Sequence, residues 1–425
     1  MSEPRLTTMP GGERVVSERI RGIRSVAVGV WIGTGSRDEP DNRAGVSHFI
    51  EHLLFKGSSR YSAQDIAELF DTMGAELNAA TSREATMVYT RVPDDALEQA
   101  VAVMLNMVFD PSFADLDSER EVVLEEIAMV EDNPQDLVHD LAGEAVFGGH
   151  PLGRAVIGRS DVIASVSRRA LRAFHGGAYT GPNVVVSAAG NIAHDRLVEL
   201  VGGAARAGTG RGKPPGRTLV RSMRPSCRFH RKRTEQYHVV LSGPGVSRTD
   251  DRRFALALLD AIVGGSASSR LFQEIREKRG MAYSVYSYTS QFQETGQVGI
   301  YLGTREDNLG ECMRVTAGEL ASLAGGELRP GELERAKQNM RGRLLLALES
   351  TSSRMTRLGR SVLTDVPLLD VKETLRRVDA VTPDEIGALA HELFAPERLS
   401  VAGIGPSEKR FRAAAAHVAP LGAVS

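Results

Sequence analysis

Cysteine is scarce in this sequence, since Cys227 and Cys312 are the only two among 425 residues. Two isolated cysteines are too few for the disulfide framework of a secreted domain, and neither belongs to a CxxC pair that binds metal. Long apolar runs are also missing, because no stretch approaches the roughly 18 residues that a membrane-spanning helix needs. The first 21 residues mix charge, proline and glycine and lack the apolar stretch of a signal peptide. We therefore expect a cytoplasmic protein without a membrane partner.

An excess of either charge is missing as well, because 52 basic and 54 acidic residues leave a net charge of −2. A general nucleic-acid-binding protein would show a strong basic excess. One local basic cluster, residues 206–233, is interspersed with glycine and proline, which is typical of a solvated linker between domains. The chain length fits two domains of about 150–200 residues each.

The sequence does contain one succession of elements twice. The first half is predicted to form a strand, two helices, two strands, two helices and a strand, at 25–32, 44–55, 62–73, 75–80, 85–92, 94–108, 116–131 and 183–189. The second half repeats much of this order, at 238–241, 253–263, 268–278, 282–291, 296–303 and 309–323. The repeat indicates an α+β fold of two duplicated halves, each a mostly antiparallel sheet with helices mainly on one face. We predict a first half at 1–212, a basic linker at 213–233 and a second half at 234–425.

The helix predicted at 44–55 carries two histidines and a glutamate within an apolar sequence. Residues i, i+3 and i+4 share a helical face, so His48, Glu51 and His52 point the same way. Two imidazoles one turn apart can bind one zinc ion, and a carboxylate beside them can take a proton from the attacking water. This H-x-x-E-H order inverts the commoner H-E-x-x-H motif. Chance can produce the spacing, but burial of three polar groups is costly unless a metal or hydrogen bonds satisfy them.

A catalytic zinc normally has three protein ligands, so a further acidic or imidazole ligand is expected. The best candidates lie in the acidic helix at 116–131, where Glu119 and Glu126 are two turns apart and share a face. One would bind zinc and the other would support the ligands from behind. Spacing alone does not choose between Glu125 and Glu126. The expected cofactor is one zinc ion per chain, although cobalt or manganese can substitute at such ligands in vitro.

With its surroundings, the motif resembles the pitrilysin/insulinase family of zinc peptidases, the inverzincins. The resemblance is closest to the branch that contains mitochondrial processing peptidase and its small bacterial relatives. It extends over nearly the whole chain and is carried by segments at 28–33, 35–39, 45–57, 74–79, 81–84 and 150–153. The family's Glu-Arg-x-Val-x-x-x-Glu pattern matches residues 119–126, which implies that Glu126 is the third ligand and Glu119 the supporting acid.

The same resemblance implies a role for the second half, whose helix at 253–263 carries no histidine. Relatives use an arginine and a tyrosine seven residues apart, matching Arg276 and Tyr283, to reach the zinc site. Both side chains can donate to a carbonyl oxygen as it gains negative charge. From composition alone, Arg276 would be a surface charge and Tyr283 a core or interface residue. The resemblance implies one active and one inactive half that face each other as a clamshell.

These features predict a zinc metalloendopeptidase that cleaves short or unfolded peptides with Glu51 as the general base. An extended peptide would add to the edge of the first sheet through backbone hydrogen bonds, at Leu77, Asn78, Ala79 and Ala80. Two alternatives stay open: a non-catalytic scaffold or assembly subunit of the same fold, and a metallohydrolase of a non-peptide amide. We expect peptide substrates and pairing as a homodimer or with a related subunit, without nucleic acid.

Overall fold

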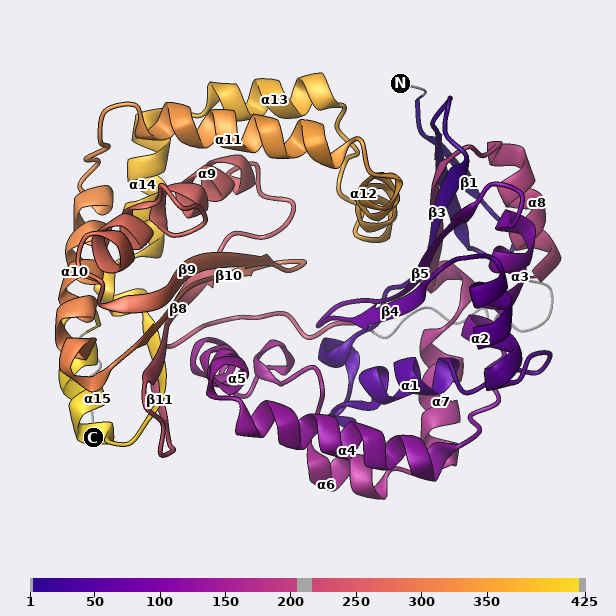
Figure 1. Cartoon of the computed structure of the whole chain (residues 1–425), viewed down its shortest axis with the longest axis horizontal. Helices are drawn as coiled ribbons and strands as arrows, with labels where there is room; N and C mark the ends of the chain where they lie inside the picture. The colour runs from indigo at the N-terminus through magenta and orange to yellow at the C-terminus, as the bar shows by residue number, and fades with distance from the viewer. Residues whose placement is uncertain (1–2, 205–215, 420–425) are drawn as a thin grey trace. The chain divides into compact units, whose positions relative to one another are not determined.

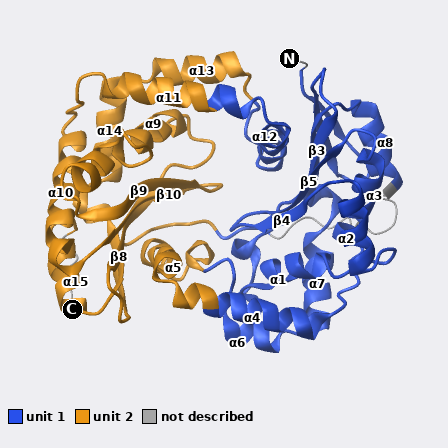
Figure 2. Cartoon of the chain, in the orientation of Figure 1, with its two compact units in different colours: residues 1–128, 155–218, 344–368 blue, residues 129–154, 219–343, 369–425 orange. Residues whose placement is uncertain are grey.

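The computed structural model describes residues 3–204 and 216–419, which form two compact units. The first unit contains residues 1–128, 155–218 and 344–368, and the second contains residues 129–154, 219–343 and 369–425 (Figure 2). Neither unit is continuous along the chain, so the predicted halves at 1–212 and 234–425 describe sequence order and not these compact units. Residues 213–215 of the predicted linker lie outside the described ranges.

The first unit is built on a six-stranded sheet with the order β1-β2-β6-β3-β5-β4 (Figure 1). All its pairings are antiparallel except that of β2 with β6. The strands β3 and β6 are buried along nearly their whole length, because helices cover both faces, and they therefore have continuous apolar sequences. The strands are β1 (Arg5–Thr8), β2 (Arg14–Arg19), β3 (Ser25–Ile32), β4 (Leu77–Thr81), β5 (Thr86–Pro93) and β6 (Val184–Gly190).

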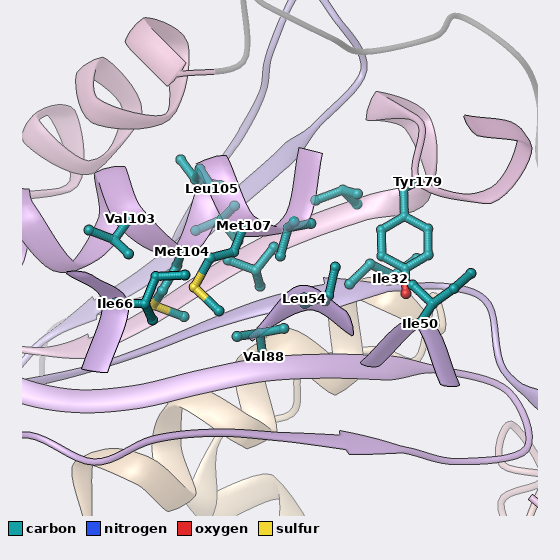
Figure 3. Packing of buried hydrophobic residues seen from close by; sticks show 14 of the residues in the cluster. Ile32, Ile50, Leu54, Ile66, Val88, Val103, Met104, Leu105, Met107 and Tyr179 are labelled. Atoms are coloured by element: carbon teal, nitrogen blue, oxygen red, sulfur yellow. The ribbon is translucent and has the colours of Figure 1, made fainter. Parts of the chain in front are cut away.

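Most helices of the first unit pack on one face of this sheet, around a large apolar core (Figure 3). The helix α12 (Thr351–Leu363) covers the opposite face, where Met355 and Leu358 contact Trp31. The other helices are α1 (Val46–Leu54), α2 (Ala63–Thr72), α3 (Leu97–Phe109), α4 (Leu116–Asp132), α6 (Ser160–Ser165), α7 (Arg168–Ala178) and α8 (His194–Ala204). Of α4, the residues up to Ala128 belong to this unit.

The second unit is built on a five-stranded sheet with the order β7-β11-β8-β10-β9. This order repeats β2-β6-β3-β5-β4 of the first sheet, including the parallel pairing, here of β7 with β11. The strands are β7 (Cys227–Arg231), β8 (Tyr237–Gly245), β9 (Ala282–Gln291), β10 (Gly296–Thr304) and β11 (Ser400–Gly405). The predicted duplicated α+β fold with mostly antiparallel sheets is therefore confirmed.

One strand of the second unit lies within the predicted linker at 213–233. In β7 the partly buried Cys227 and Phe229 pack against the core, while Arg228 between them and His230 after them are exposed. This period of two is the signature of a half-buried strand. The basic composition of residues 213–233 predicts a linker, and it masks the alternation of partly buried and exposed side chains in β7. For residues 227–231 the linker prediction is therefore wrong.

The helices of the second unit follow the arrangement of the first. The helices α9, α10, α14 and α15 contribute to the core on one face of the sheet, and α5 covers the other through Val138 and Ala142. The predicted helix at 268–278 is shorter and wound as a π-helix, η6 (Phe272–Glu277). The helices are α5 (Pro134–Phe147), α9 (Arg253–Val263), α10 (Glu306–Ala324), α11 (Glu332–Ala347), α13 (Val371–Ala380), α14 (Pro383–Leu393) and α15 (Glu408–Ala415). Within the described ranges, no helix combines the length and apolarity needed to cross a bilayer.

The halves of the sequence thus exchange one covering helix each. The helix α12 follows the second-half elements in sequence but packs on the first sheet, and α5 precedes β6 in sequence but packs on the second sheet. The helix α12 approaches the sheet closely at Gly359, where a Cβ atom would lie 2.0 Å from the indole nitrogen of Trp31. That indole N–H donates a hydrogen bond of 2.8 Å to Ser187 Oγ.

We expect the substitution Gly359→Leu to lower the thermal unfolding midpoint of the protein clearly, because the added side chain must displace Trp31 or the helix. Overpacking of this kind costs about 1–3 kcal/mol. Gly176→Leu is the matched control, since Gly176 is an exposed glycine of α7 whose Cβ would meet nothing within 4 Å. Circular dichroism melting of both variants checks the prediction. Equal midpoints for Gly359→Leu and Gly176→Leu would contradict it.

Candidate metal centre

The N-terminus of α1 is fixed by a glycine and by a buried acid. Gly45 has φ of 96°, in the left-handed region that favours glycine, and a Cβ there would lie 2.6 Å from the carbonyl oxygen of Ile157. The carboxylate of Glu39 accepts hydrogen bonds from the amide N–H groups of Gly45 and Ser47, at 2.7 and 2.6 Å. Its negative charge suits the positive end of the helix dipole. The start of α1 is therefore set by contacts outside the helix.

The two faces of α1 differ in chemistry. Five apolar residues are fully buried, and Figure 3 shows two of them, Ile50 and Leu54, in the core; the five are Val46, Phe49, Ile50, Leu53 and Leu54. The polar residues His48, Glu51 and His52 are only partly buried, as their i, i+3, i+4 spacing predicts. Packing of the apolar face thus holds the three polar side chains in place.

The helix α4 brings Glu126 to the two histidines. Its Oε2 lies 3.7 Å from Nε2 of His48 and 3.4 Å from Nε2 of His52. One ligand atom from each of the three residues lies within 4.8 Å of the others. Ligand atoms that share a tetrahedral zinc at bonds of about 2.0–2.1 Å lie about 3.3–3.5 Å apart. Two imidazoles and a carboxylate at these separations fit a zinc ion, with one coordination position left open.

The electrostatics of His48 also suit a metal ligand. Burial, and then the neighbouring His52, lower the pKa of His48 to about 4. The ring is therefore neutral at physiological pH, which is the form of imidazole that binds metal. Metal binding at neutral pH needs no proton loss from His48.

The two acids between which spacing could not choose differ in exposure. The side chain of Glu125 belongs to the exposed surface of α4, whereas Glu126 faces both histidines. The geometry supports Glu126 as the third ligand, as the family pattern implies.

Behind His52 lies the buried Glu119. Its Oε2 is 3.4 Å from Nδ1 of His52, and its Oε1 forms a 2.7 Å ion pair with Nζ of Lys56. An acid that contacts the distal nitrogen of a ligating histidine orients the ring and raises its basicity. The sequence analysis does not predict this role of Lys56. The available signal is that Lys56 lies four residues after His52, where a basic side chain can pair with the supporting acid Glu119.

The carboxylate of Glu51 is held by β4. Its Oε2 accepts a hydrogen bond from the hydroxyl of Thr81, the last residue of that strand. Burial raises the pKa of Glu51 above its usual range, and the hydrogen bond from Thr81 opposes this shift in part. A carboxylate with a raised pKa is a better proton acceptor, which suits a general base. The sequence alone does not identify this role of Thr81. The available signal is that Thr81 directly follows the predicted substrate residues 77–80.

The predicted substrate residues Leu77, Asn78, Ala79 and Ala80 all lie in β4, which ends the strand order of the first sheet. Side chains along it alternate, with Asn78 and Ala80 exposed. The amide N–H of Ala79 donates to Oδ1 of Asn78 at 2.8 Å. The strand leads directly into Thr81 and so to Glu51. Binding of a peptide here stays a prediction.

The residues Arg276 and Tyr283 lie together in the second unit. Arg276 belongs to η6, and Tyr283 is the second residue of β9. The guanidinium carbon of Arg276 lies 4.7 Å from the ring centroid of Tyr283 and 4.7 Å from that of Phe272. Tyr283 is 78% exposed, which does not fit a core residue. Their action on a substrate carbonyl stays a prediction.

Two family models match the chain along most of its length. Residues 14–160 match the model described as "Insulinase (Peptidase family M16)", and residues 165–340 match "Peptidase M16 inactive domain". A protein of Mycobacterium leprae, named an uncharacterized zinc protease, is 42% identical over 406 residues, or 94% of this chain and 91% of that protein. The chain belongs to peptidase family M16.

Other relatives and solved structures agree with membership of the M16 family. The uncharacterized zinc protease YmxG of Bacillus subtilis is 40% identical over 94% of this chain and 98% of that protein. A Pseudomonas fluorescens structure described as a peptidase M16 inactive domain superposes with a TM-score of 0.89 at 22% identity, over 96% of this chain and 99% of that one. A Helicobacter pylori protease gives 0.86 at 19%, over 96% and 100%. At these identities the two structures show the shared two-domain fold alone.

Proposed function

We propose that this M16 protein is a zinc metalloendopeptidase that hydrolyses short or unfolded peptides, with one zinc ion per chain. The observation that carries the proposal is the set of His48, His52 and Glu126 ligand atoms within 4.8 Å of one another. The two histidines share one face of α1 with Glu51, a carboxylate of raised pKa. The zinc-protease names of relatives that match nearly the whole chain support it. A cytoplasmic location and pairing as a dimer or with a related subunit are part of the same proposal.

The chain's own residues would divide the chemistry as follows. Bound zinc would supply Lewis acidity, which polarises a peptide carbonyl and makes water a better nucleophile at neutral pH. Glu51 accepts the proton of the attacking water and passes it to the leaving amine. Thr81 holds the Glu51 carboxylate toward β4, and Glu119 fixes the ring of His52.

Substrate positioning would use both units. An extended peptide would pair with the edge of β4 through backbone hydrogen bonds, which would favour unfolded chains over folded ones. Arg276 and Tyr283 would donate to the carbonyl oxygen as negative charge develops on it. If both are supplied by movement of the second unit, closure of the halves gates turnover.

Removal of the metal is expected to abolish cleavage of a quenched peptide library by the purified protein. Dialysis against a chelator should lower the rate to background, and one equivalent of zinc should restore it. The reason is that the open coordination position of a catalytic zinc is where water or the substrate carbonyl is activated. Magnesium added in place of zinc serves as the control. Full cleavage by metal-free protein would remove zinc from the mechanism. A protein that holds zinc and cleaves nothing would favour the scaffold function.

A further inference from the structure

Arg217, from the basic segment predicted as a solvated linker, is anchored within the first unit. Its guanidinium donates two hydrogen bonds to the carboxylate of Asp38, at 2.8 and 3.0 Å. It also donates to the carbonyl oxygens of Gly33 and Glu84, at 3.1 and 2.8 Å. Thr218, which follows it, is the last residue of this stretch in the first unit. The chain therefore leaves the metal-binding unit at a fixed point.

The segment that binds Arg217 also holds the start of α1. Residues 33–39 connect β3 to the approach to α1, and Asp38 within them accepts a 3.0 Å hydrogen bond from the amide of Gly35. The next residue, Glu39, accepts the hydrogen bonds from Gly45 and Ser47 that fix the helix N-terminus. A shift of Asp38 thus moves the acid on which the position of α1 depends.

The turn between β4 and β5 is tied to the same point. The amides of Ser36 and Arg37 donate to the carbonyl oxygens of Ser82 and Arg83, at 3.2 and 2.8 Å. The Arg37 guanidinium forms a 2.5 Å ion pair with Glu84, whose carboxylate also lies 3.6 Å from the Arg217 guanidinium.

The Thr81 hydroxyl, which holds Glu51, lies directly before this turn. Glu39 holds the N-terminus of α1, and Thr81 holds the Glu51 carboxylate. Both belong to segments that adjoin the contacts of Arg217.

We propose that Arg217 is a positioning residue, which holds residues 33–39 and the 82–85 turn together and thereby sets the placement of α1 and Glu51. The kinetic part of this proposal rests on the proposed peptidase function. The zinc-affinity part rests on the proposed zinc site, and the part that concerns local order depends on neither.

The charge balance explains why the arginine is needed. The carboxylates of Asp38 and Glu84 are 4% and 6% exposed; Arg217 pairs with both, and Arg37 pairs with Glu84. Removal of one partner from a buried ion cluster leaves an uncompensated charge, which is strongly unfavourable. Without Arg217, the acids gain solvation only if residues 33–39 or the turn move outward. That movement displaces Glu39 or Thr81.

The test is Arg217→Met beside Arg217→Lys, with Arg224→Met as the matched control. Arg224 is an exposed arginine of the same basic segment, with no hydrogen bond or ion pair to any described residue. Zinc affinity is measured by competition with a chromogenic chelator, and hydrogen–deuterium exchange reports the order of residues 33–55 and 77–90. We expect Arg217→Met to weaken zinc binding about 10-fold and to speed exchange in both segments, as loss of outer contacts to a metal site does. Arg217→Lys, which keeps the charge but not the forked donors, should fall between.

In peptide cleavage, Arg217→Met should lower kcat roughly 10- to 100-fold, because small misplacements of catalytic groups are this costly, with KM changed less than about threefold. Zinc affinity, exchange and kcat equal to those of Arg224→Met would overturn the proposal and leave the peptidase function intact. Should the wild type cleave no peptide, zinc affinity and exchange still decide. Should Arg217→Met fail to fold, Arg217→Lys decides: intermediate zinc binding supports positioning, and wild-type binding overturns it.

Discussion

The substitution Glu51→Gln is expected to abolish peptide hydrolysis while zinc remains bound. Glutamine keeps the size of the side chain and can still contact Thr81, but it cannot accept the proton of the attacking water. Loss of a positioned general base costs about 10²–10⁴-fold in rate, so kcat should fall by roughly 10³-fold. Steady-state cleavage of a fluorogenic peptide and the metal content of the same sample measure both halves of the expectation.

The matched control for this variant is Glu121→Gln, which makes the same chemical change at an exposed position of α4. It should leave kcat and zinc content at wild-type levels. Activity retained by Glu51→Gln would remove this residue from the base role. Loss of zinc together with activity would instead assign Glu51 to the metal ligands.

Glu126→Gln is expected to separate the two acids that spacing alone could not distinguish. An amide is a poor ligand for zinc beside two imidazoles, so the affinity for zinc should fall on the order of 100-fold, with cleavage lost at limiting metal. Glu125→Gln, one residue earlier on the same helix, should leave both properties unchanged, because its side chain is exposed. Chelator competition on the two variants, side by side, gives the comparison.

The reverse pattern, with weak zinc binding in Glu125→Gln and wild-type binding in Glu126→Gln, would mean that α4 turns Glu125, and not Glu126, toward the two histidines. Equal loss in both variants would mean that the acidic helix acts through its total charge. In neither case would the three-ligand set of His48, His52 and Glu126 stand.

The parts of the fold that the sequence predicts are those whose burial is visible locally. Strand β3 was predicted with its observed bounds because a strand covered on both faces reads as an unbroken apolar run. The exchange of α5 and α12 was not predictable in this way. The apolar residues Met355 and Leu358 show that α12 must bury a face, but no local pattern states which sheet will cover it. That choice is made by tertiary packing, at Gly359 against Trp31.

The candidate site also has a part that local sequence patterns predict and a part that only tertiary contacts determine. Helical spacing alone groups His48, Glu51 and His52, since all three lie within one and a half turns. Glu126 comes from another helix and was chosen by family pattern. The supports from Thr81, Glu39 and Arg217 are contacts between residues that are distant in sequence, and an isolated glutamate or threonine carries no signal of such a contact.

The exchange of covering helices has a consequence for how the protein is made. Synthesis runs from the N-terminus, so all the proposed zinc ligands leave the ribosome more than 200 residues before α12 does. Until residues 351–363 emerge, the face of the first sheet that includes Trp31 lacks the cover of α12. A nascent or truncated chain that ends at the linker therefore has Glu51 and the three proposed zinc ligands but neither a complete fold nor Arg276 and Tyr283. Completion of the first unit therefore waits for the last fifth of the chain, which contains α12.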